Sequence, residues 1–170
     1  CINGAKTGNT ATFDGLSTLL KGMDTEYNNG TDKVYIDLST SAAMDSNYKS
    51  MLDMLDEFLS GISCKPTLLL GNSKMIAKLK SIARRAGYLT QTEDSFGKTA
   101  QGYDNILFYD MGNYWNGKAN TPCVPIRDKV DGSNTITGLT DLYAVTLGLN
   151  AFHGVSLTGS SIINTYMPDL

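Results

Sequence analysis

Two stretches of the chain carry apolar residues at a spacing of three or four, the pattern of an amphipathic helix. This spacing predicts helices over Asp45–Ser60 and Ser73–Ala86. Gly61 and Gly87 follow these stretches, and glycine is typical of a helix end. The residues that can cap the starts are Asp45 or Ser46 for the first helix and Asn72 or Ser73 for the second.

Five stretches predict strands. In Lys33–Leu38 apolar and polar residues alternate, as in a half-buried strand; the others are short, mainly apolar stretches: Pro66–Gly71, Asn105–Asp110, Leu142–Leu149 and Ile162–Tyr166. Leu142–Leu149 is rich in β-formers and apolar on both faces, so we expect it in the interior of the sheet. The order of strands and helices predicts an α/β (α+β) domain with a mixed central sheet flanked by helices.

The remaining stretches are polar and rich in turn residues. Thr90–Tyr103 and Gly112–Thr121 contain glycine and show no apolar period, so we expect loops there. Phe13–Leu20 predicts a short helical turn, and Asp131–Asn134 predicts a turn. Val124–Ile126 is expected to be a short extended piece.

Composition limits the class of protein. The 170 residues, 41% hydrophobic and 18% charged, suit one domain over residues 1–170. A net charge of −3 gives no general attraction to nucleic acid or to an anionic membrane, and no apolar run reaches the roughly 20 residues of a membrane span. The three cysteines, Cys1, Cys64 and Cys123, lie too far apart to suggest a disulfide framework or a metal site. Because the first residue is Cys1, we expect the chain to be part of a longer protein.

The sequence contains only incomplete motifs for phosphate binding, for general base catalysis and for a catalytic nucleophile. Gly97–Thr99 matches the end of a phosphate-binding loop, but Thr92 stands where the first glycine is needed. His153 is the only histidine, and nothing in the sequence gives it a partner. Gly154–Thr158 lacks the second glycine of a serine-nucleophile elbow. We therefore assign no catalytic, cofactor-binding or metal-binding residue.

Charged residues divide between the two predicted helices. Asp53, Asp56 and Glu57 fall on the polar side of the first, which indicates a solvated acidic face. The second helix carries five cations and no acid: Lys74, Lys78, Lys80, Arg84 and Arg85. These cations suit a solvated face, a contact with an acidic neighbour within or between subunits, or nucleic acid.

Several short motifs occur in an order that resembles the tailed-bacteriophage major capsid protein family, whose fold is shared with encapsulins. The motifs are Ile2-Asn3-Gly4, Thr7-Gly8, Phe13-Asp14-Gly15-Leu16, Leu68-Leu69-Leu70-Gly71-Asn72, Ala83-Arg84-Arg85-Ala86-Gly87-Tyr88, Val124-Pro125-Ile126, and Tyr143-Ala144-Val145 with Gly148. The resemblance implies the axial domain, which packs around the five-fold or six-fold centre of a capsomer. The family's arm, extended hairpin and spine helix have no counterpart here, so residues 1–20 are expected to be a remnant that links to the spine.

The resemblance implies a structural virion protein, not an enzyme: a self-assembling major capsid (head) subunit of a phage or prophage. Its partners would be copies of itself, with scaffolding protein or protease during assembly in the host bacterial cytoplasm, and with no membrane, cofactor or specific nucleic acid. The piece alone would be a monomer or a weak oligomer, and loops Thr90–Gly102 and Asn113–Asn120 would face the capsomer axis. Two alternatives stay open: part of an α/β enzyme, or a nucleic-acid-binding module that uses helix 73–87.

Overall fold

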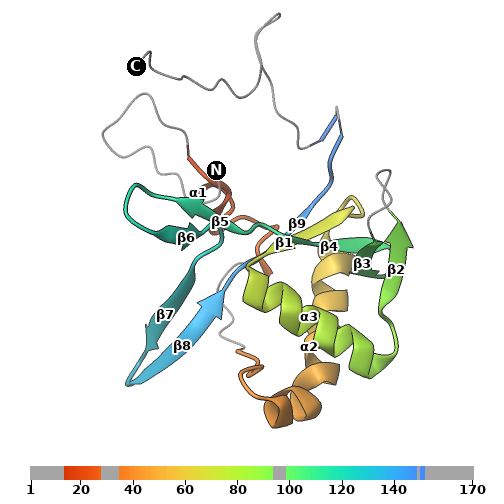
Figure 1. The fold of residues 1–170 in the computed structure, drawn as a ribbon, viewed down its shortest axis with the longest axis horizontal. Helices are drawn as coiled ribbons and strands as arrows, with labels where there is room; N and C mark the ends of the chain where they lie inside the picture. The colour runs from red at the N-terminus through yellow and green to blue at the C-terminus, as the bar shows by residue number, and fades with distance from the viewer. Residues whose placement is uncertain (1–13, 28–34, 94–98, 149, 152–170) are drawn as a thin grey trace, which may run out of the picture.

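The computed structural model describes residues 14–27, 35–93, 99–148 and 150–151. Its centre is a five-stranded sheet in the order β2-β3-β4-β1-β9, and two further pairs of strands, β5-β6 and β7-β8, form separate ribbons (Figure 1). The helices are α1 (Leu16–Leu19), α2 (Ser41–Gly61) and α3 (Ser73–Ala86). The strands are β1 (Leu68–Gly71), β2 (Thr90–Glu93), β3 (Thr99–Tyr103), β4 (Ile106–Asp110), β5 (Asn113–Trp115), β6 (Asn120–Pro122), β7 (Ile126–Asp131), β8 (Asn134–Thr140) and β9 (Leu142–Val145).

The central sheet is mixed, as the sequence predicts. Strand β1 runs parallel to β4 and antiparallel to β9, so that Leu69 lies between Phe108 and Ala144. Strands β2, β3 and β4 form an antiparallel meander. The parallel pair is joined through α3, which is the crossover that parallel strands require.

Helices α2 and α3 cover one face of this sheet, and the larger core lies between them (Figure 1). The side chains buried there come from both helices and three strands: Met51, Leu52, Leu55, Leu69, Ile76, Leu79, Ile82, Ala83, Tyr103, Ile106 and Phe108. Helix α2 begins at Ser41, four residues before the predicted start, because Thr40 and not Asp45 or Ser46 is the N-cap. The Thr40 hydroxyl accepts a hydrogen bond from the Ala43 N–H at 3.1 Å.

Helix α3 has the predicted bounds and ends. Asn72 is its N-cap, and the side-chain oxygen of Asn72 accepts the Lys74 N–H at 3.0 Å. At the other end Gly87 has φ +76°, the left-handed conformation that glycine adopts without a Cβ penalty.

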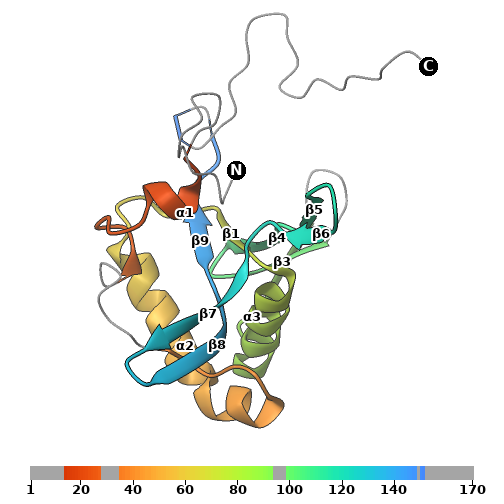
Figure 2. The same ribbon diagram turned by 90° about the vertical axis from the view of Figure 1, so that its left-hand side faces the viewer.

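A smaller core lies on the other face of the sheet. It buries Leu70, Val124 and Tyr143, and Leu16 of α1 packs against it. Figure 2 shows α1 beside β9, on the side of the sheet away from α2 and α3. The predicted helical turn is therefore confirmed in its short helix, although Leu19 and Leu20 are exposed.

The prediction that Leu142–Leu149 lies in the interior of the sheet is wrong. Strand β9 covers only Leu142–Val145, and in the described part of the chain it pairs with β1 alone, at the edge of the sheet. It is apolar on both faces because a core lies on each side: Leu142 and Ala144 pack against the larger one, Tyr143 and Val145 in the smaller one. A strand that is apolar on both faces therefore has both faces covered, but it can still lie at the edge of a sheet.

Three other predictions need correction. Residues 35–38 form no strand; instead Ile36 and Leu38 pack as an extended segment against the larger core. The expected loop Thr90–Tyr103 contains β2 and β3, and the polar stretch Gly112–Thr121 contains the paired strands β5 and β6. In both stretches the strands are held by backbone hydrogen bonds, and their side chains lack the apolar alternation from which strands are predicted. The predicted strand Ile162–Tyr166 lies outside the described residues.

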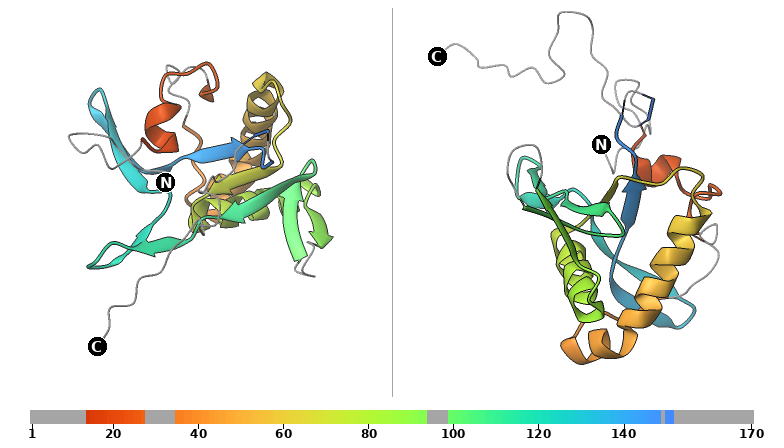
Figure 3. Two further views of the ribbon diagram at one scale, coloured as in Figure 1. Left: turned by 90° about the horizontal axis from the view of Figure 1, so that it is seen from above. Right: turned by 90° about the vertical axis from the view of Figure 1, so that its right-hand side faces the viewer.

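The two ribbons leave the body on the side opposite the β2 edge of the sheet. In the left view of Figure 3 they diverge from each other, away from α2 and α3. The predicted turn Asp131–Asn134 is confirmed as the end of the β7-β8 ribbon, where Gly132 has φ +62°. In the part of the chain that the structure describes, no helix is long and apolar enough to cross a membrane.

Candidate functional site

The β5-β6 ribbon holds exposed aromatic side chains in β5, next to a turn that is held by hydrogen bonds. Trp115 pairs with Asn120 in the ladder and is 64% exposed, and Tyr114 beside it is 47% exposed. The turn is fixed by Asn116, whose side-chain oxygen accepts the N–H groups of Lys118 and Ala119, both at 2.9 Å. The aromatic rings are thus presented to solvent by backbone that is itself well bonded.

The β7-β8 ribbon is longer and exposes aliphatic residues. Val130 is 70% exposed and Ile126 is 39% exposed. A register shift between Arg127 and Lys129 marks a β-bulge, and the Gly138 N–H opposite donates to the Asp128 carboxylate at 3.0 Å. Because an isolated two-stranded hairpin is at best marginally stable in water, the ribbon depends on how its base is held.

The base of this ribbon is fixed by a polar cluster. Arg127 forms an ion pair with Asp141, which also accepts a hydrogen bond from the Tyr143 hydroxyl at 3.3 Å. Burial, and then the charge and hydrogen bond of Asp141, raise the pKa of Tyr143 to about 12. Lys129 adds a contact from the ribbon to the body, since its Nζ lies 5.8 Å from the centre of the Tyr35 ring.

The basic residues of α3 divide into two groups. Lys78 donates to the Ser39 carbonyl at 2.9 Å, and Arg85 donates to Asp45 at 2.5 Å; both tie α3 to the start of α2. The side chains of Lys74, Lys80 and Arg84 make no hydrogen bond or ion pair with other described residues. A contact with an acidic neighbour, one of the three alternatives that the sequence leaves open, therefore exists within the chain for Arg85.

The acidic residues of α2 are exposed, as predicted, and two of them bind tyrosines. The Tyr103 hydroxyl donates to Asp56 at 2.9 Å, and the Tyr27 hydroxyl donates to Glu57 at 2.8 Å. Burial, and then the hydrogen bond to Asp56, raise the pKa of Tyr103 to about 12. Asp53 makes no such bond within the described ranges.

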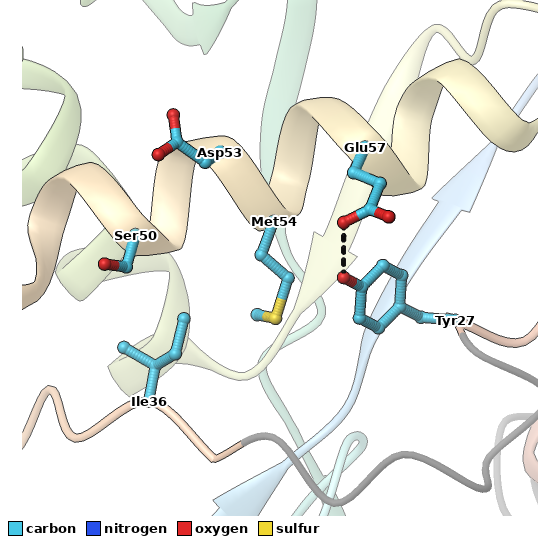
Figure 4. Close-up of a pocket in the computed structure, with 6 residues that line it drawn as sticks. All are labelled: Tyr27, Ile36, Ser50, Asp53, Met54 and Glu57. Atoms are coloured by element: carbon cyan, nitrogen blue, oxygen red, sulfur yellow. Dashed lines mark hydrogen bonds between the residues drawn. The ribbon is translucent and has the colours of Figure 1, made fainter.

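Two open depressions flank α2. One, of about 290 Å³, is shown in Figure 4 and is lined by Tyr27, Ile36, Ser50, Asp53, Met54 and Glu57. The other, of about 600 Å³, lies at the end of α3 and is lined by Asp56, Gly87, Tyr88, Leu89, Thr90, Tyr103 and Asp104. Both combine carboxylates with apolar or aromatic side chains.

Most of the residues tested for chemistry in the sequence lie outside the part of the chain that the structure describes. Gly97, Lys98, His153 and the segment Gly154–Thr158 lie outside the described residues, and Thr99 begins β3. No group of three or more His, Cys, Asp and Glu residues in the described ranges could hold a metal ion. Cys64 is exposed, Cys123 is partly buried, and neither belongs to a disulfide.

No family model, no curated protein and no solved structure matches the chain. The features that stand out are therefore those of the molecule itself: two projecting ribbons and two charged helix faces. The ribbon residues were not identified from the sequence. The available signal was the single tryptophan, Trp115, next to Tyr114 in an otherwise polar stretch.

Proposed function

We propose that this chain belongs to a structural virion protein, the self-assembling major capsid subunit of a phage or prophage, and that it contacts copies of itself. The observation that carries the proposal is the pair of ribbons that hold large apolar side chains in solvent. These side chains are Tyr114 and Trp115 on one ribbon and Ile126 and Val130 on the other.

Exposed side chains of this kind suit contacts between subunits. Trp and Tyr are enriched among the residues that dominate protein interfaces, and they lose little conformational entropy when covered. In a symmetric shell each contact is repeated by every subunit, so two ribbons per copy supply many identical contacts. The order of the capsid-like motifs supports the same proposal.

The alternatives have less support. A nucleic-acid-binding module would use the cations of α3, but Lys78 and Arg85 are already bound within the chain. An enzyme would need a site, and the motifs at Gly97–Thr99 and Gly154–Thr158 each lack a glycine that the corresponding catalytic motif requires. We therefore expect no catalytic residue and no cofactor.

The test is expression of the complete gene product in bacteria, followed by sedimentation and electron microscopy. Closed shells or capsomer rings are the expected products. A product that stays dispersed at high concentration and turns over a small molecule would contradict the proposal and favour the enzyme. Saturable binding to duplex DNA at physiological salt would favour the nucleic-acid module.

A further inference from the structure

Two cations of α3, one half-buried and one exposed, lie on the flank of the helix that faces away from α2. Lys78 and Arg85 mark the flank toward α2, because they bind Ser39 and Asp45. Lys80 and Arg84 are one turn apart and, at 100° per residue, lie on the other side of the helix. They have no partner among the described residues.

The acidic depression lies on the opposite flank of the helix pair. It is formed where Tyr27 and Ile36 meet the face of α2 that carries Asp53 and Glu57 (Figure 4). Tyr27 and Glu57 are joined by their hydrogen bond, and the Met54 side chain lies between this pair and Ile36 (Figure 4). The depression therefore has carboxylates at its rim and apolar groups within.

This chemistry fits a long cationic side chain. The methylene stem of Lys or Arg packs on apolar groups while its charged end remains near carboxylates and water. The one cation of α2, Lys49, does not line the depression, and its Nζ lies 5.9 Å from the centre of the Tyr48 ring. The described residues thus leave the acidic rim without a cation in it.

We propose that Arg84 and Lys80 of a second copy of this chain dock in this depression, against Asp53 and Glu57. The two surfaces are complementary in charge and lie on opposite flanks, so the copies associate head to tail. A head-to-tail contact closes into a ring when its rotation permits, as a capsomer requires. The inference rests on the proposed function as a shell subunit.

Charge reversal tests the contact. Across the contact, Arg84→Glu sets an acid against Asp53 and Glu57, and Asp53→Arg sets a cation against Lys80 and Arg84. Each variant alone is expected to lower the self-association constant roughly tenfold, measured by sedimentation equilibrium at low salt. An equimolar mixture, in which unlike flanks alternate, is expected to restore association. Lys74→Glu is the matched control, because it makes the same charge change on α3 outside the Lys80–Arg84 flank; circular dichroism checks that every variant is folded.

Cross-linking locates the contact directly. A carbodiimide joins an amine to a carboxylate without a spacer, so a mixture of ¹⁴N- and ¹⁵N-labelled chains should give hybrid peptides that link Lys80 to Asp53 or Glu57. An association constant that neither reversal changes, or hybrid peptides that do not contain these residues, overturns this inference. Either result leaves the shell proposal unaffected. A wild-type chain that shows no self-association at all contradicts the inference as well, and the shell proposal then depends on the particles of the complete gene product.

Discussion

The buried side chain of Asn72 connects the start of α3 to Val124 of the smaller core. It is 4% exposed, caps α3 through its side-chain oxygen, and donates from its amide to the Val124 carbonyl at 2.8 Å. Val124 is fully buried in the smaller core, so no water is expected to replace that donor. The residue therefore fixes the start of α3 relative to the segment that leads into the β7-β8 ribbon.

Asn72→Ala should lower the free energy of unfolding by about 2–3 kcal/mol, since it removes the cap and leaves a buried carbonyl without a donor. Asn72→Asp keeps an acceptor for the Lys74 N–H but sets a buried carboxylate oxygen against the Val124 carbonyl, so its loss should be at least as large. Urea denaturation followed by circular dichroism measures both. Equal stability of Asn72→Ala and wild type would show that neither bond matters.

Tyr103 should make the fold sensitive to alkaline pH. Its pKa is about 12 in the folded chain against an ordinary value of 10.0, because burial and Asp56 disfavour the tyrosinate. Folding thus favours the neutral phenol, and this stabilisation is fully present below pH 10 and is lost as pH rises from 10 to 12. The melting temperature of Tyr103→Phe should fall less steeply across that range, and an unchanged slope would contradict this role. At pH 8 the variant should lose about 1 kcal/mol with its hydrogen bond to Asp56.

At the scale of elements, the β3-β4 hairpin depends on a close approach of two backbones. Asp104 and Asn105 both have positive φ, 47° and 62°, which is the two-residue turn that matches the twist of paired strands. Beside the turn, a Cβ on Gly102 would lie 2.3 Å from the Ile106 carbonyl oxygen. Only glycine fits there without a shift of the strand.

Gly102→Ala should therefore lower the free energy of unfolding by about 2 kcal/mol or more, because the atom it meets belongs to the backbone and cannot rotate away. Gly61→Ala is the matched control: a Cβ there meets nothing within 4 Å, and alanine favours helix. The control should be neutral or slightly stabilising in the same urea experiment. A tolerated Gly102→Ala would mean that β3 and β4 are farther apart than described.

The helices could be predicted from the sequence because their apolar stripes face a core directly. Ser73–Ala86 was predicted with both its bounds, whereas the start of α2 was placed too late because Thr40 is one of several possible caps. The strands β2 and β3 were missed because Thr, Gln and Gly side chains carry no apolar alternation. The turn between β3 and β4, Asp104-Asn105, was a usable signal for β3, since both residues tolerate positive φ.

Of the candidate surfaces, the charged helix faces could be predicted from the sequence and the ribbons could not. The charged faces of α2 and α3 follow from helical spacing, and the structure adds which cations are already bound: Lys78 and Arg85. That distinction could not be predicted, because it depends on how Ser39 and Asp45 meet α3 in three dimensions. The ribbon aromatics were missed because a polar stretch with glycine was expected to be a loop.

For the whole molecule, we expect stability to depend on the two cores and assembly to depend on the two ribbons. The two cores lie between the central sheet and its helices, while the ribbons project away from them (Figure 3). A substitution on a ribbon therefore removes little that holds the domain together. It removes contact area that only another subunit would cover.

Trp115→Thr should separate the two properties. Because Trp115 is 64% exposed, the free energy of unfolding of this chain should change by less than about 0.5 kcal/mol, and threonine keeps the β-propensity of the strand. In the complete gene product, the same substitution should reduce the yield of shells or rings several-fold, as counted by sedimentation and electron microscopy, since a central aromatic contact is lost from every interface. Tyr88→Thr is the matched control, because Tyr88 is 62% exposed but lies at the end of α3 and not on a ribbon. Equal loss of particles in both variants would point to a general effect of removing surface aromatics, and full yield with Trp115→Thr would show that the β5-β6 ribbon takes no part in assembly.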